Sequence, residues 1–92
     1  MNPLPHPEQI RELVLRTFAE LRGRPIARAD LSETVLIRDG NYYGRAYRAG
    51  GLLAMLEVQS ATLSFLTREG QLLRTVSFNG ESQLATPQRQ AA

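Results

Sequence analysis

Glycines punctuate the second half of the chain at intervals of roughly ten or twenty residues, and this spacing limits the fold more than any other feature. Gly40, the pair Gly50-Gly51, Gly70 and Gly80 separate segments that are rich in apolar and aromatic residues. One strand and one tight turn together occupy about ten residues. All five prolines lie outside these segments, as the hydrogen bonding of a sheet requires. The spacing therefore predicts an antiparallel meander.

The segments between these turns have the composition of strands that are at least half-covered by a core. Gly50-Gly51 is the strongest hairpin signal, because two successive glycines can both adopt the positive φ angles of a tight turn. Residues 60–61 are the weakest turn, and one long bent strand over 52–67 is an alternative. Gly44 lies inside a strand and indicates a bulge or a close backbone approach. The expected strands are residues 33–38, 42–49, 52–59, 62–67 and 72–78, with turns at 39–41, 50–51, 60–61 and 69–70.

An amphipathic helix is predicted over residues 7–22, ahead of the first strand. Pro7 suits the first helical turn, where its missing N–H costs nothing. Gly23 suits the residue just beyond the helix, and Pro25 blocks its continuation. The apolar residues that recur at helical spacing, and that should face the sheet, are Ile10, Leu13, Val14, Phe18 and Leu21.

The chain has 92 residues, which suffice for one hydrophobic core, because a chain of this size buries only about 60–65% of its unfolded surface. We predict an α+β fold, with one N-terminal amphipathic helix packed on a four- to five-stranded antiparallel β-meander. Residues 1–6 are expected to form a flexible arm, residues 7–80 the single domain and residues 81–92 a disordered tail. No segment approaches the roughly 20 apolar residues that span a bilayer, so we expect a cytoplasmic location and no membrane association.

Strand alternation, followed across the turns, divides the sheet into two faces. A three-residue first turn adds Val35 and Ile37 to the face beneath the helix, whereas a two-residue turn adds Leu36 instead. We prefer the three-residue turn because it covers more apolar surface. The other residues expected beneath the helix are Tyr43, Tyr47, Ala54, Leu56, Val58, Leu63, Phe65, Leu72, Val76 and Phe78.

The opposite face is informative because large apolar side chains gather on its middle strands. Leu53, Met55, Leu66 and Leu73 are predicted to lie close together there, with Tyr42 at the margin. A solvated face normally alternates to polar residues, and an exposed apolar patch of this kind marks an interaction site. Because a single helix covers only one face, we interpret the chain as a non-enzymatic interaction domain that self-associates through the other face. The expected assembly is a homodimer, and a different protein partner is the alternative.

A small nucleic-acid-binding domain is the alternative function. All eleven basic residues are arginines, and arginine both binds phosphate groups and stacks on bases. The candidate contacts are Arg38, Arg45 and Arg48, which are interleaved with tyrosines. The formal net charge is only +2, because nine carboxylates offset the arginines, and this favours the protein-interaction hypothesis.

Residues suited to catalysis or metal binding are few. The chain has no cysteine and no lysine, which excludes thiolate and Schiff-base chemistry. His6, the only histidine, lies in the predicted arm, while Asp30 and Asp39 fall in a linker and a turn, where aspartate usually hydrogen-bonds its own backbone. We therefore expect no enzyme activity, metal or cofactor. Glu57 is expected on the outer face, paired with Arg48 or with a second subunit, and a carboxylate in a pocket is the alternative.

Overall fold

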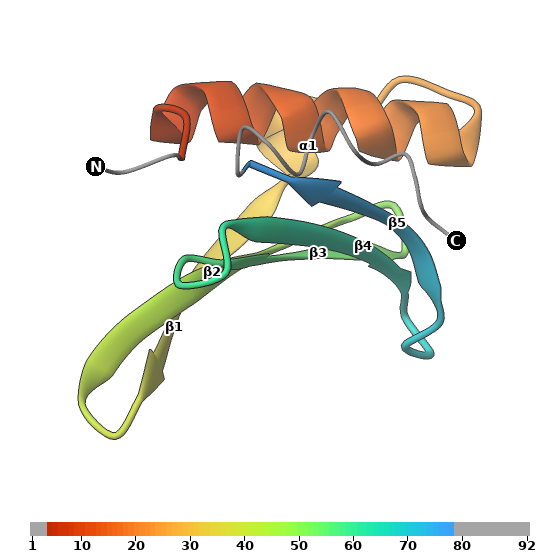
Figure 1. The fold of residues 1–92 in the computed structure, drawn as a ribbon. Coiled ribbons are helices and arrows are strands. Elements are labelled where there is room, and N and C mark those ends of the chain that lie inside the picture. The colour runs from red at the N-terminus through yellow and green to blue at the C-terminus, as the bar shows by residue number, and fades with distance from the viewer. Residues whose placement is uncertain (1–3, 79–92) are drawn as a thin grey trace.

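The computed structural model describes residues 4–78, which form one α-helix, a single 3-10 turn and a five-stranded antiparallel sheet. The helix, α1 (Pro7–Arg22), lies along one face of the sheet (Figure 1). The strands follow chain order, so each pairs with the next through a turn. The predicted α+β meander is confirmed, with five strands. The predicted tail, residues 81–92, lies outside the described residues.

The observed strands lie within two residues of the predicted bounds, and α1 has the predicted bounds. Between α1 and the sheet the chain makes one short helical turn, η1 (Arg28–Asp30). Within residues 4–78, no helix is both long enough and apolar enough to cross a membrane. The strands are β1 (Ser32–Arg38), β2 (Asn41–Ala49), β3 (Leu52–Glu57), β4 (Thr62–Thr67) and β5 (Leu72–Ser77).

Both ends of α1 are capped by the residues that flank it. The His6 imidazole accepts a hydrogen bond from the Glu8 backbone N–H at 3.1 Å, and the Gln9 side chain accepts one from the His6 backbone N–H at 3.0 Å. Gly23 ends the helix in the left-handed region, with a φ of 76°. Capping is thus the observed role of the only histidine. Leu4, in the predicted arm, packs against the core.

The first hairpin turn contains two residues, where three were predicted. Arg38 pairs with Asn41, which leaves Asp39 and Gly40 in the turn with φ angles of 53° and 79°. Two successive positive φ angles define the tight turn that matches the twist of a β-hairpin. The predicted Gly50-Gly51 turn has the same character, with φ angles of 58° and 80°.

The turn between β3 and β4 is longer than predicted. Glu57 pairs with Thr62, so residues 58–61 form a four-residue turn in place of the two-residue turn expected. Ala61 adopts a left-handed φ of 54° and its side chain is buried. The alternative of one bent strand over 52–67 is wrong, because β3 and β4 are separate antiparallel partners. The predicted faces of the β4 side chains are still correct, because the longer turn shifts the pairing of β3 with β4 by two residues and a shift of two leaves each side chain on the same face.

The hydrophobic core lies between α1 and the sheet. Val14 and Phe18 are completely buried, and the Phe18 ring meets the Phe65 ring edge-on, with centroids 5.8 Å apart. This is a favoured aromatic geometry, and it fixes the helix over the middle of the sheet. The buried residues of the sheet include Tyr47, Ala54, Leu56, Leu63 and Phe65, as predicted, together with Phe78 after β5.

The helix does not cover the edge strand β1. Val35 lies on the helix side, because it pairs with Arg45, but 50% of its surface is exposed. Ile37 is 58% exposed. The expectation that both residues are covered is wrong, because the β1–β2 hairpin extends away from α1 (Figure 1).

Candidate interaction face

The face of the sheet opposite α1, the outer face, is concave. The sheet arches beneath the helix, and the hairpin β1–β2 and the turn between β4 and β5 project away from it (Figure 1). Between them lies a hollow of about 410 Å³. No other helix or strand among residues 4–78 lies over this face. The arch therefore leaves a shaped surface, not a flat one, on the uncovered side.

Register places large apolar side chains across the centre of the outer face. Leu53 pairs with Leu66, and Leu66 pairs with Leu72, so the three form a row from β3 to β5. Met55 lies two residues along β3 from Leu53 and therefore on the same face. We call Leu53, Met55, Leu66 and Leu72 the outer cluster.

A bulge in β2 exchanges the faces of two tyrosines. Leu36 pairs with Gly44 but Ile37 pairs with Tyr42, so Tyr43 is the extra residue. Tyr43 lines the outer hollow, whereas Tyr42 lines a smaller hollow of about 180 Å³ on the helix side. The predictions that Tyr42 borders the outer face and that Tyr43 lies beneath the helix are therefore wrong.

A second bulge, in β5, changes which leucine joins the outer cluster. Leu72 pairs with Leu66 while Arg74 pairs with Phe65, which leaves Leu73 as the extra residue. Leu72 lines the outer hollow, although its side chain was predicted beneath the helix. Leu73, a predicted member of the interface, is 40% exposed beside it.

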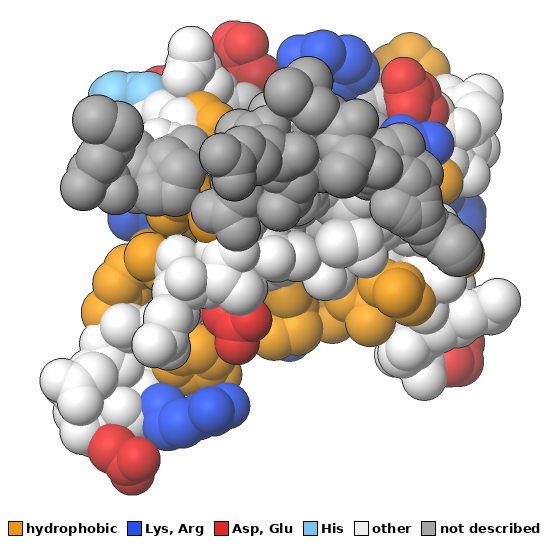
Figure 2. All heavy atoms as spheres, viewed as in Figure 1, with side chains coloured by type: hydrophobic (Ala, Val, Ile, Leu, Met, Phe, Trp, Pro, Cys, Tyr) orange, Lys and Arg blue, Asp and Glu red, His pale blue; other side chains and the backbone are white. Residues whose placement is uncertain are grey.

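The outer cluster is open to solvent to different degrees. Leu72 is 59% exposed and Met55 36% exposed, whereas Leu53 and Leu66 are half-buried. Hydrophobic side chains gather along the underside of the sheet, between the two projecting ends (Figure 2). Contiguous apolar surface in a concave setting is typical of a binding site.

Polar groups border the outer cluster at the end nearer the β1–β2 hairpin tip. The Arg38 guanidinium lies over the Tyr43 ring, 4.5 Å from its centroid, and both residues line the hollow. Glu57 lies at the same end, and its carboxylate accepts a hydrogen bond from the Ser60 hydroxyl at 2.7 Å. The predicted pairing of Glu57 with Arg48 of the same chain is not observed.

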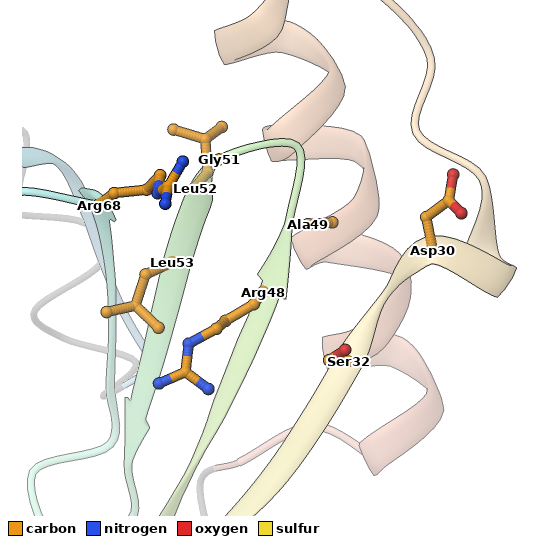
Figure 3. A pocket seen from close by; sticks show the side chains of 8 residues that line it. All are labelled: Asp30, Ser32, Arg48, Ala49, Gly51, Leu52, Leu53 and Arg68. Atoms are coloured by element: carbon orange, nitrogen blue, oxygen red, sulfur yellow. The ribbon is translucent and has the colours of Figure 1, made fainter.

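Two arginines border the other end of the outer cluster. Arg48 pairs with Leu53 across β2 and β3, and Arg68 follows β4. Both line a hollow of about 580 Å³ at the Gly50-Gly51 end of the sheet, with Asp30 on its far wall (Figure 3). Neither arginine forms an ion pair with a carboxylate of residues 4–78.

Three arginines on the helix side, Arg11, Arg45 and Arg74, are each paired with a glutamate. Glu33 of β1 accepts hydrogen bonds from Arg11 at 3.0 Å and from Arg45 at 2.6 Å. These hydrogen bonds raise the pKa of both guanidinium groups. Arg74 pairs with Glu20 at 2.8 Å in the same way and ties β5 to α1.

The structure separates the three candidate nucleic-acid contacts. Arg45 lies on the helix side, paired with Glu33, while Arg38 and Arg48 lie on the outer face. Arg48 pairs with Ser32 of β1, which lies six residues, or about 20 Å, from Arg38 on the same strand. Nucleic-acid binding stays a prediction, and its arginines do not form one patch.

The other residues considered for chemistry have structural positions. Asp30 ends η1 and Asp39 forms part of the first turn. Residues 4–78 contain no cluster of three or more histidine, aspartate or glutamate side chains that could hold a metal ion. Glu57 is exposed and hydrogen-bonded to Ser60, so it lies on the rim of the hollow.

Sequence reasoning missed three residues that line the outer face or its border. Tyr43 and Leu72 join it because of bulges, for which the only local signal was Gly44 beside the first. Arg68 lies against the turn at Gly51, and this position follows from the four-residue turn between β3 and β4.

Comparisons of the chain with protein-family models, with curated proteins and with solved structures found no match. The geometry of the outer face is thus the basis for proposing a function.

Proposed function

We propose that this chain is a non-enzymatic interaction domain that self-associates as a homodimer through its outer face. The observation that carries the proposal is the outer cluster, which lies on a concave sheet face that no other helix or strand among residues 4–78 covers. Burying such apolar side chains stabilises a complex by about 25 cal/mol for each Å² removed from water. A second copy of the same face offers a matching apolar floor.

The border of the face supports a second copy as the occupant. It carries positive charge at Arg48 and Arg68 at one end and, at the other, the Glu57 carboxylate together with Arg38 on the edge strand. A surface with both signs of charge around an apolar centre can be complementary to itself. In a two-fold dimer the same patch is used twice, so each positive end can meet a negative end.

The size of the face suggests a dimer of modest affinity. Five strands spaced about 4.8 Å apart, with central strands of six residues, cover roughly 400 Å² when the face is viewed in projection. A standard stable interface buries about 800 Å² on each partner. We therefore expect a dimer that dissociates at concentrations of about 1–100 μM.

Sedimentation velocity over a protein concentration series tests the proposal. The wild-type chain should change from monomer to dimer between about 1 and 500 μM. Met55→Glu, which places a charge in the outer cluster, should remain monomeric throughout. Ile37→Glu is the matched control, because Ile37 is also an exposed apolar side chain but lies on the edge strand away from the outer cluster. A wild-type chain that stays monomeric at the highest concentration would refute the proposal.

A further inference from the structure

We infer that the two subunits meet with their β3 strands antiparallel, so that Glu57 of each subunit binds Arg48 and Arg68 of the other. This inference rests on the proposed self-association and specifies its geometry. It follows from the order of side chains along β3, from the charges at the two ends of the outer face and from the lack of ion-pair partners for those charges among residues 4–78.

The two ends of the outer face along β3 carry different charges. Leu53, Met55 and Glu57 alternate along this strand, with Met55 midway between the other two. Arg48 lies beside Leu53, so positive charge and the Glu57 carboxylate are separated along the strand by about 13 Å. A two-fold axis that lies between the two faces near Met55 and runs perpendicular to β3 places each Leu53 end opposite a Glu57 end.

The charges at both ends lack an oppositely charged partner within residues 4–78. Arg48 and Arg68 form no ion pair there, and Glu57 accepts a hydrogen bond from the Ser60 hydroxyl. Asp30, across the hollow from the arginines, is not paired with either of them. On the helix side, by contrast, Arg11, Arg45 and Arg74 are each paired with a glutamate.

Stacking the two faces takes part of the water away from these charges, and an unpaired charge in an interface is costly. An antiparallel arrangement brings Glu57 to the arginine pair twice in each dimer. A parallel arrangement brings arginines toward arginines, which like-charge repulsion disfavours. Arg38 also carries positive charge at the Glu57 end, but it lies on the edge strand β1, two strands away from β3, where its guanidinium is held over the Tyr43 ring. If the two sheets pack in the aligned way, the charge pattern thus favours antiparallel over parallel β3 strands.

A charge-swap experiment tests this geometry. One variant carries Glu57→Arg, and the other carries Arg48→Glu together with Arg68→Glu. Each variant alone should dimerise at least about tenfold more weakly than the wild type, because like charges then meet at both ends. An equimolar mixture should form a heterodimer, since both contacts are again between opposite charges: one has its signs exchanged, and the other keeps the native Glu57 against the native Arg48 and Arg68. Its affinity should fall within about threefold of the wild-type value.

Glu12→Arg and Arg16→Glu are the matched controls, because both residues are exposed on α1, away from the outer face. Neither should alter the dissociation constant by more than about twofold. Circular dichroism establishes that each variant is folded, and Glu57→Gln offers a milder change that should weaken the dimer and reduce its salt dependence.

The outcomes separate this inference from the proposed function. If the wild type dimerises and Met55→Glu dissociates it, but the mixed charge variants bind no better than each alone, the antiparallel contact is wrong and the interaction face stands. If the wild type is monomeric at about 500 μM, the proposed function and this inference both fail.

Discussion

Gly44 is the position where one added methyl group should damage the fold most. A Cβ at this residue would lie 2.0 Å from the backbone carbonyl oxygen of Leu56 and 3.1 Å from its carbonyl carbon. Carbon and oxygen atoms normally approach to about 3.3 Å, so the two central strands β2 and β3 would have to separate by more than about 1 Å. The atoms in the way belong to the backbone, which cannot move aside by changing a rotamer. Gly44→Ala therefore acts on the sheet itself.

The expected destabilisation combines two effects. Overpacking in a well-packed interior costs about 1–3 kcal/mol, and an obstructing backbone places this site at the upper end. The neighbouring hydrogen bond from the Val58 N–H to the Tyr43 carbonyl, 3.0 Å long, would lengthen, at a cost of about 1 kcal/mol. The free energy of unfolding should thus fall by about 3–4 kcal/mol, a large part of the usual 5–15 kcal/mol.

Urea unfolding followed by circular dichroism, at one fixed protein concentration, measures this loss. Gly40→Ala is the control, because Gly40 has open space around it and a φ of +79°. Only backbone strain opposes alanine there, at about 1–2 kcal/mol. A Gly44→Ala protein that loses less than about 1 kcal/mol, or less than Gly40→Ala, would refute the assigned close approach of β2 and β3.

Two further predictions concern the helix side of the sheet. Glu33→Gln removes the carboxylate between Arg11 and Arg45, whose side chains are 23% and 29% exposed, and should lower the unfolding free energy by about 1–2 kcal/mol. Glu12→Gln, at a more exposed site, should change the unfolding free energy by less than about 0.5 kcal/mol. Equal effects of the two substitutions would contradict a stabilising role for the Glu33 ion pairs. Burial raises the pKa of Tyr47 above 10.0, so the folded state keeps this proton to higher pH than the unfolded state and stability falls as pH rises above about 10. Tyr47→Phe should reduce this loss of stability at alkaline pH, measured as urea midpoints between about pH 9 and 11. If the variant loses as much stability as the wild type, groups other than Tyr47 cause the loss.

The parts of the fold that the sequence predicts are those determined by local chemistry. Gly50-Gly51 supplies two residues with positive φ, and Pro7 and Gly23 fit the two ends of α1. The sequence also predicts which side chains of the central strand β3 face outward, because Leu53 and Met55 alternate with the buried Ala54. Each of these features depends on residues that are neighbours in the chain.

The errors concern features that depend on distant contacts. Whether Tyr42 or Tyr43 faces outward is decided by a bulge, which places two residues of β2 opposite one of β1. The choice between Leu72 and Leu73 is decided in the same way in β5. Alternation along a strand cannot reveal such an insertion, because a single extra residue reverses every side chain beyond it.

The two bulges also account for the shape of the candidate interface. A bulge bends its strand and increases the local twist, and these two lie in β2 and β5, whose hairpin ends project below the arch (Figure 1). The same insertions turn Tyr43 and Leu72 into the hollow that this curvature creates. The bulges thus relate the bending of the outer face to the presence of Tyr43 and Leu72 on it. Without the bulges, regular alternation along β2 and β5 would place Tyr42 and Leu73 on this face instead, and both strands would bend less.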